Sequence, residues 1–340
     1  MDKEFLDDTL LDDELLPDSG LFTSAVAQIR AKENTLLSEQ VLDNLMKCET
    51  AEECIQTLLE KGWEEPEDGQ TESMLRAEKE KCWSFVRSIC SEKEMHFFDI
   101  FRYADDFHNL KAAIKESYIQ KQVPNVYKSN GTIPVETLRK CAADNDFSAL
   151  SFTMMRAAEE AREVLFHTGD SQLCDVIIDK AALLEIAKAG KETKNDLLQQ
   201  YAELKCASAD ISIAIRASRA DKDTDFLQRA FAECTSLSVP ALVAATRNGL
   251  DSIFEYLEST SYADAVPAIK AGAACFDKWC DDRMIKLIKP QKYNAFTISP
   301  IAAYVLAKEC EIKSVRIILS GKINGLQDEK VRERVRESYV

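Results

Sequence analysis

The feature that most constrains the fold of this chain is how rarely a helix-breaking residue interrupts it. Only 10 glycines and 8 prolines occur in 340 residues, and apolar residues recur at helical spacing between them. Residues 193–219 are a long example, with apolar positions that fall on one helix face: Leu197, Tyr201, Leu204, Ile211 and Ile215. Strand and helix patterns do not alternate along the chain. The sequence therefore predicts an all-α protein.

Capping and breaking residues divide the chain into separate helices. Thr50-Ala51-Glu52-Glu53 is a capping box that opens one helix, and Gly62 ends it. Pro124 and the Asn130-Gly131 turn separate the first third of the chain from the remainder. Further helices are expected at residues 71–90, 103–121, 148–167, 170–189, 193–219 and 301–320, with a charged helix from about 328.

The charge of the chain excludes several kinds of partner. It holds 59 acidic and 43 basic residues, which gives a net charge of −16. Such a chain is not expected to bind nucleic acid or to adhere directly to anionic lipid. The start of the chain lacks the pattern of a secretory signal, and no run of 18 apolar residues exists, so direct membrane insertion is not expected. Membrane association is therefore expected to depend on a partner protein.

The cysteines and histidines do not form a metal-ligand pattern. The 11 cysteines are odd in number and scattered, and none lies in a CxxC motif. We interpret most of them as reduced, small core residues of a cytosolic protein. His96, His108 and His167 have no cysteine or histidine at ligand spacing, so no metal site is predicted.

Motifs of catalysis and cofactor binding are missing from the sequence. It has no GxxxxGKS or GxxxxGKT loop, no GxGxxG, no GxSxG and no HExxH. The acidic pairs Asp105-Asp106 and Asp281-Asp282 are adjacent on helices, so their side chains point apart and cannot work together as acid and base. No catalytic residue, cofactor or small-molecule substrate is predicted.

A long internal period is visible in three helical windows, 103–119, 204–220 and 308–324, which are offset by 101 and 104 residues. Their apolar positions coincide in two sets, Leu110 with Ile211 and Val315, and Ile114 with Ile215 and Leu319. Three true repeats explain the nearly equal offsets. Any three amphipathic helices can also be aligned in this way, so both readings stay open at this point.

Residues 300–326 carry a more specific pattern. An apolar helix is followed by Lys-Glu-Cys-Glu-Ile at 308–312, Val-Arg-Ile-Ile-Leu at 315–319 and Gly-Lys-Ile-Asn-Gly at 321–325. This segment resembles the C-terminal signature of the V-type ATP synthase C-subunit family, which is homologous to the d-subunit of eukaryotic V-ATPases. Residues 22–30 resemble the opening helix of the family, residues 103–113 its first-repeat motif, and Thr168-Gly169-Asp170 a further family pattern.

The resemblance covers about residues 20–340 and leaves out the acidic leader 1–19. The second window departs from the first: Ala207 stands where an acid is expected, and Asp210 where asparagine is expected. The resemblance implies three similar helical domains around a pseudo-threefold axis, which form a funnel. We place their boundaries at 20–130, 131–236 and 237–340.

The resemblance also implies a function. The family lies on the cytoplasmic face of a membrane ring of proteolipid subunits, and the tip of the central stalk inserts into its funnel. The expected function is that of a non-catalytic rotor subunit, which transmits torque between stalk and ring for ATP-driven ion transport or ATP synthesis. The alternatives are a helical scaffold or adaptor for other proteins and an enzyme of an unfamiliar helical class.

Two sets of residues follow from this interpretation. The aligned apolar positions Leu110, Ile114, Ile211, Ile215, Val315 and Leu319 are expected to form the core of each repeat. Basic residues that follow the second apolar position of each window within about one turn are candidate stalk contacts: Lys115, Arg216, Arg219 and Lys322. The alternative is that these four are ordinary solvated charges.

Overall fold

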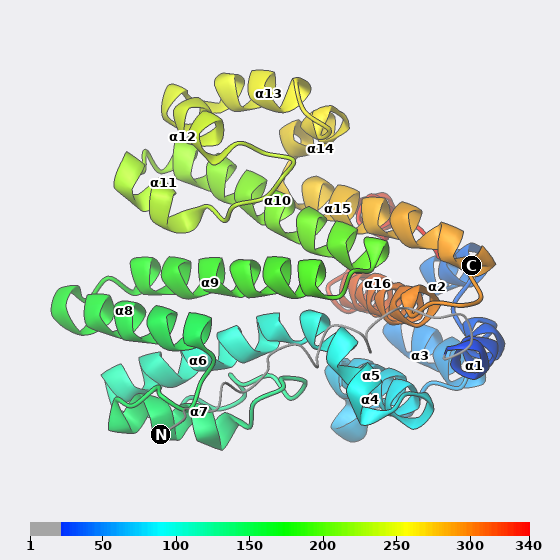
Figure 1. Ribbon diagram of the computed structural model, residues 1–340. Helices are drawn as coiled ribbons and strands as arrows, with labels where there is room; N and C mark the ends of the chain where they lie inside the picture. The colour runs from blue at the N-terminus through cyan, green and yellow to red at the C-terminus, as the bar shows by residue number, and fades with distance from the viewer. Residues whose placement is uncertain (1–21) are drawn as a thin grey trace. The chain divides into compact units, whose positions relative to one another are not determined.

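The computed structural model describes residues 22–340 (Figure 1). Every regular element in this range is a helix, with seventeen α-helices and four 3-10 helices and no strand among the described residues. The all-α prediction is confirmed. The predicted acidic leader, 1–19, lies outside the described residues.

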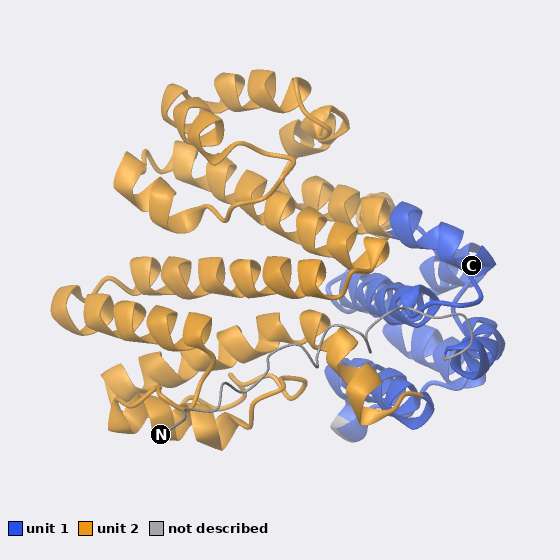
Figure 2. Ribbon diagram, viewed as in Figure 1, with its two compact units in different colours: residues 1–89, 285–326, 337–340 blue, residues 90–284, 327–336 orange. Residues whose placement is uncertain are grey.

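The chain forms two compact units (Figure 2). Unit 1 contains the described residues up to 89 together with 285–326 and 337–340, and unit 2 contains 90–284 and 327–336. Unit 1 is thus assembled from both ends of the chain. The three repeats with boundaries at 130 and 236 stay a prediction from the sequence.

Unit 1 is built around one central helix, α16 (Ser299–Ile323), which is buried on all sides as far as Lys308 and has one partly exposed side beyond it, where Arg316 and Ser320 lie. A helix that is apolar all round must be surrounded by other elements. The elements that pack on it are α1 (Thr23–Glu33), α2 (Glu39–Lys47), α3 (Ala51–Glu60), α4 (Thr71–Ile89) and η5 (Lys289–Tyr293). The 3-10 helix η2 (Glu67–Gly69) precedes α4. The helix expected at 301–320 is confirmed, and the structure shows that it forms the core of this unit.

Unit 2 is a succession of packed helices that includes α6 (Tyr103–Ile119) and the two longest helices of the unit, α9 (Ser171–Glu192) and α10 (Asp196–Arg219). Helix α6 packs on α7 (Val135–Asp144), α8 (Phe152–Thr168) and α9, and α9 packs on α10. One apolar core spans α6 to α9 and includes Phe107, Leu138, Ala158 and Ile178. The remaining elements are α5 (Glu92–Met95), η3 (His96–Phe101), α11 (Thr224–Ala230), α12 (Val239–Asn248), α13 (Leu250–Glu258), η4 (Ala263–Ala265), α14 (Val266–Ala271), α15 (Ala273–Ile288) and α17 (Asp328–Arg332). Helix α15 belongs to this unit only as far as residue 284.

The Thr168-Gly169-Asp170 pattern forms the turn between α8 and α9. Gly169 ends α8 in the left-handed region, with φ 71°, which glycine adopts without a steric penalty. Asp170 then caps α9, because its Oδ1 accepts a hydrogen bond of 2.8 Å from the backbone N–H of Leu173. The pattern therefore has a structural explanation at this turn.

Gly190 allows α9 and α10 to approach closely. A Cβ atom placed on this residue lies 2.7 Å from the Cβ of Ala202 and 3.2 Å from the backbone oxygen of Leu198. Contacts this short require one of the helices to shift. The small residues at 190 and 202 thus set the separation of the two helices here.

We predict that Gly190→Ala destabilises the protein by about 1–3 kcal/mol, although the same change in an open helix position is stabilising. Urea unfolding followed by circular dichroism measures the effect. Ala202→Gly removes the nearer of the two clashing atoms, so the double variant should recover part of the loss. A Gly190→Ala variant as stable as the parent protein would show that the close approach does not constrain the packing.

Candidate functional site: buried polar groups on the three window helices

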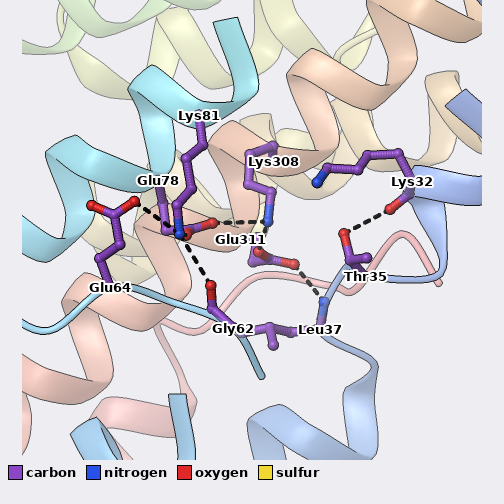
Figure 3. A network of polar contacts seen from close by, with 9 residues as sticks. All are labelled: Lys32, Thr35, Leu37, Gly62, Glu64, Glu78, Lys81, Lys308 and Glu311. Carbon is purple, nitrogen blue, oxygen red and sulfur yellow. Dashed lines mark hydrogen bonds and ion pairs between the residues drawn. The ribbon is translucent and has the colours of Figure 1, made fainter. Parts of the chain in front are cut away.

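The Lys-Glu-Cys-Glu-Ile segment of α16 supplies a buried ion pair in unit 1 (Figure 3). Lys308 and Glu311 lie one turn apart, so their side chains meet on one helix face. The Lys308 Nζ is 2.5 Å from Glu311 Oε1 and 3.5 Å from Glu78 Oε2 of α4. The side chain of Lys308 is only 5% exposed, so both interactions form away from water.

The ion pair extends into a larger network through α4. Lys81 Nζ lies 3.0 Å from Glu78 and 3.2 Å from Glu64, and it donates a hydrogen bond of 3.1 Å to the backbone oxygen of Gly62. Burial alone lowers the pKa of Lys81, but the two carboxylates outweigh it and raise the pKa overall. Figure 3 shows Glu64, Glu78, Lys81, Lys308 and Glu311 converging from separate segments of unit 1.

Glu311 also holds the turn between α1 and α2. Its Oε2 accepts a hydrogen bond of 2.5 Å from the backbone N–H of Leu37, a residue 274 positions away in the sequence. Burial raises the pKa of Glu311 even though Lys308 beside it favours the charged form. One carboxylate thus links the central helix to both a lysine and a distant loop.

The first window uses the same kind of contact in unit 2. Asp106 on α6 is fully buried and accepts hydrogen bonds from the Ile133 N–H at 3.0 Å and the Thr132 hydroxyl at 2.7 Å. Burial raises the pKa of Asp106, although these hydrogen bonds act in the opposite direction. One turn later, Asn109 pairs with the backbone of Lys128 through bonds of 2.8 and 2.9 Å. Both side chains fix the loop between α6 and α7.

The second window, on α10, has a similar arrangement, but its carboxylate lies one turn further along the helix. Ala207 is buried and apolar, and the carboxylate is instead at Asp210, whose Oδ1 accepts a bond of 3.0 Å from the Ala232 N–H. On the preceding turns of α10, Glu203 accepts bonds of 3.1 and 2.7 Å from the backbone N–H groups of Thr235 and Ser236. The departure seen in the sequence therefore moves the carboxylate along the helix and keeps its contact with a loop.

Asp210 differs from the other buried carboxylates because one of its oxygens has no partner among the described residues. The residue is fully buried, and its Oδ2 makes no hydrogen bond there. Burial raises the pKa of Asp210 to about 7, against smaller opposing effects of the Ala232 N–H and the Lys180 charge. This site is therefore a source of pH-dependent stability.

Sequence reasoning missed these buried polar groups as a set. It correctly separated Asp106 from its neighbour Asp105, which is less buried. The available signal was a polar residue inside an apolar window, at Asp106, Asn109, Asp210 and Glu311. Their partners lie in loops far along the chain, so the sequence pattern could not supply them.

The six predicted repeat-core residues are all buried. Ile215 is 9% exposed, and the others are at 0–1%: Leu110, Ile114, Ile211, Val315 and Leu319. Their assignment to three equivalent repeats stays a prediction.

The four candidate stalk contacts lie in different surroundings. Lys115 Nζ lies 2.5 Å from Asp175 of α9, and Lys322 Nζ donates a bond of 2.7 Å to the backbone oxygen of Met46. Arg216 and Arg219 are exposed in the last turn of α10. The Arg216 side chain donates a 3.2 Å hydrogen bond from its Nε to the Ser212 oxygen of the same helix. These two arginines are therefore the more accessible pair.

Groups suited to metal binding are not found in the part of the chain that the structure describes, where no cluster of three or more His, Cys, Asp or Glu side chains occurs. All eleven cysteines lie in this part and are free thiols, and six of them are buried. Burial raises the pKa of the Cys82 thiol to about 12, so this cysteine is a core residue without thiolate character at neutral pH. His108 is half-buried, and its Nε2 lies 2.9 Å from the Val126 oxygen.

Taken together, these features define a helical protein whose buried polar groups connect its own helices and loops. The chain matches the family described as ATP synthase (C/AC39) subunit over residues 25–334, and it belongs to this family. The resemblance seen in the sequence is thereby confirmed.

Curated relatives agree with the family. The chain is 22% identical to the C-subunit of the V-type sodium ATPase of Enterococcus hirae over 319 residues, which cover 92% of this chain and 97% of the relative. It is 21% identical to the C-subunit of the A-type ATP synthase of Thermococcus kodakarensis, with 92% and 89% covered. It is also 21% identical to the same subunit of Methanocaldococcus jannaschii, with 90% and 84% covered.

Family membership makes this chain a component of a membrane-associated ATPase or ATP synthase complex, in association with other subunits. Across residues 22–340, none of the helices combines the length and apolar character needed to cross a bilayer.

We predict that Lys308→Met destabilises the protein by about 3–5 kcal/mol, because Glu311 and Glu78 are then left buried with one cation fewer. Urea unfolding at pH 7 measures the effect. Adding Glu311→Gln removes one of the stranded charges, so the double variant should be more stable than Lys308→Met alone. Lys47→Met, at an exposed lysine of α2 in the same unit, is the matched control. Equal loss in both single variants would contradict the role of the network.

We predict that Asp210→Asn changes how stability depends on pH. Because the pKa of Asp210 is about 7 in the folded protein and about 4 when unfolded, its ionisation makes stability fall as the pH rises from about 4 to 7. Asparagine cannot ionise, so the variant should gain stability relative to the parent protein between pH 5 and pH 8. Urea unfolding at these two pH values measures the gain, and the exposed Asp144→Asn is the control. Parallel pH profiles of parent and variant would refute the prediction.

Proposed function

We propose that this chain is a rotor subunit that couples the central stalk of a V-type or A-type ATPase to its membrane ring of proteolipid subunits. The family match over residues 25–334 carries the proposal, together with relatives named as the C-subunit of such complexes. The coupling serves ATP-driven ion transport or ATP synthesis, and ATP itself reacts in another part of the complex. The chain performs no catalysis and needs no cofactor for this task.

The physical demand on such a subunit is stiffness under load. Close-packed helices have low compressibility, and loops held by buried hydrogen bonds move little relative to the helices that hold them. Asp106, Asn109, Asp210 and Glu311 make contacts of this kind. We infer that these contacts limit the torque lost to internal deformation in each unit.

The proposal places the chain on the cytoplasmic side of the membrane, where it is held by its protein partners. We infer that Arg216 and Arg219 are the stalk contacts among the four candidates. Both are exposed at the end of α10, whereas Lys115 and Lys322 already engage Asp175 and the Met46 oxygen. Two arginines one turn apart present a compact positive site to acidic side chains of a stalk protein.

We predict that the purified chain binds both the central-stalk subunits and the detergent-solubilised ring of its own complex. Arg216→Glu with Arg219→Glu should weaken stalk binding at least about tenfold and leave ring binding unchanged, because paired charges at an interface become repulsive. Isothermal titration calorimetry measures both affinities. Lys93→Glu with Lys140→Glu, two exposed lysines of unit 2, gives the same change in net charge as a control.

The outcomes separate the proposals. Failure of the parent chain to bind either stalk or ring would remove the coupling function and favour a scaffold or adaptor with other protein partners. Binding that the arginine variant retains in full would keep the function but reject these two residues as stalk contacts.

A further inference from the structure

The end of η5 and the loop that follows it present two exposed aromatic side chains. Tyr293 is 92% exposed and Phe296 is 58% exposed, and they are the most exposed large hydrophobic residues of unit 1 described here, alongside Ile323 at 58%. A tyrosine that is 92% exposed has almost no protein atoms around it, so it projects from the surface. We refer to residues 289–298 as the aromatic loop.

The aromatic loop is held in a defined conformation. Arg30 of α1 donates hydrogen bonds from its Nη2 to the backbone oxygens of Gln291 at 2.6 Å and Asn294 at 2.7 Å. Glu33 fixes the same guanidinium through contacts of 2.8 Å. Within the loop, the Asn294 side chain donates to the Thr297 hydroxyl at 2.8 Å and accepts from the Phe296 N–H at 3.2 Å. The exposed aromatics are therefore preorganised, which lowers the entropy lost when they bind a partner.

The charge around the loop is opposite to that of the chain as a whole. No Asp or Glu occurs between Asp282 and Glu309, and Lys286, Lys289 and Lys292 all lie in this stretch. Glu337, at 3.4 Å from Lys286 and 3.8 Å from Lys289, offsets one of the three lysine charges, and the nearby Glu33 is balanced by its ion pair with Arg30. Lys292 stacks on the ring of Tyr339, 4.6 Å from its centroid. A net positive charge thus accompanies the two aromatics.

We propose that the aromatic loop contacts the headgroup layer of a bilayer that contains anionic phospholipid. Tyrosine and phenylalanine are suited to the boundary between headgroups and acyl chains, and lysines near them interact favourably with anionic headgroups. The contact is peripheral and involves no membrane-spanning segment. It adds a direct lipid contact to the protein partners of the proposed function and does not depend on them.

A local contact of this kind is compatible with a net charge of −16. The screening length at physiological ionic strength is about 8 Å, so a lipid surface that touches the loop interacts with its lysines more than with acids elsewhere on the protein. The structure favours lipid over an acidic protein because Tyr293 is 92% exposed and so projects from the surface. Hot spots of protein interfaces typically lie in well-packed, desolvated surroundings, whereas a fluid headgroup layer closes around a projecting side chain.

Vesicle flotation of the full-length chain tests the proposal. With vesicles of equal phosphatidylcholine and phosphatidylglycerol in about 50 mM salt, we expect binding that weakens in pure phosphatidylcholine or in about 500 mM salt. Tyr293→Ala with Phe296→Ala should reduce the partition coefficient about tenfold or more, because the buried apolar area is lost. Tyr293→Trp should bind at least as strongly as the parent chain. Phe152→Ala, which removes a 75% exposed aromatic from unit 2, is the matched control and should change nothing.

Circular dichroism and thermal unfolding confirm that the variants fold. Absence of binding by the parent chain to the anionic vesicles overturns the proposal, and so does equal binding by the double alanine variant. A double variant that loses binding to the detergent-solubilised ring, with no vesicle binding by the parent chain, would identify a protein as the partner of the loop and would also reject the lipid contact. Stalk binding measured on the same samples shows separately whether the coupling function holds.

Discussion

Unit 1 depends on the interaction of one buried lysine with two carboxylates. Lys308 lies between Glu311 of its own helix and Glu78 of α4, and all three side chains are almost entirely removed from water. A buried ion pair adds little to stability compared with apolar packing, but loss of one partner is strongly destabilising. The arrangement therefore favours one packing of α4 against α16 over alternatives in which the charges do not meet.

Unit 2 also has buried carboxylates that fix its packing, but they bind the backbone of loops and not a buried lysine. Asp106 and Asp210 are fully buried, and each satisfies a backbone N–H of a loop that would otherwise have no partner in the interior. A side chain from a long helix thus provides the hydrogen-bond acceptor that the backbone of the irregular loop needs. In an all-helical protein, this arrangement connects the loops to the helices, which are its most rigid elements.

The helices and their buried faces could be predicted from the sequence, because both depend on local spacing. Residues 301–307 are apolar on every side of the expected helix, and α16 is buried all round in this part. The polar contacts could not be predicted in the same way. Glu311 meets Leu37 across 274 residues, and Lys322 meets Met46 across 276, separations at which no periodic pattern gives information. The ion pair of Lys115 is a further example, because its partner Asp175 comes from another helix.

The discontinuous composition of unit 1 has a consequence for biosynthesis. Helices α1 to α4 are translated early, but α16, the element they enclose, leaves the ribosome only after the whole of the intervening segment 90–284. During this interval their apolar faces have no native partner, while most of unit 2 can already fold as a continuous stretch. The nascent chain is therefore expected to complete its second unit first, and its N-terminal helices are exposed to chaperones and to premature self-association until synthesis is nearly finished.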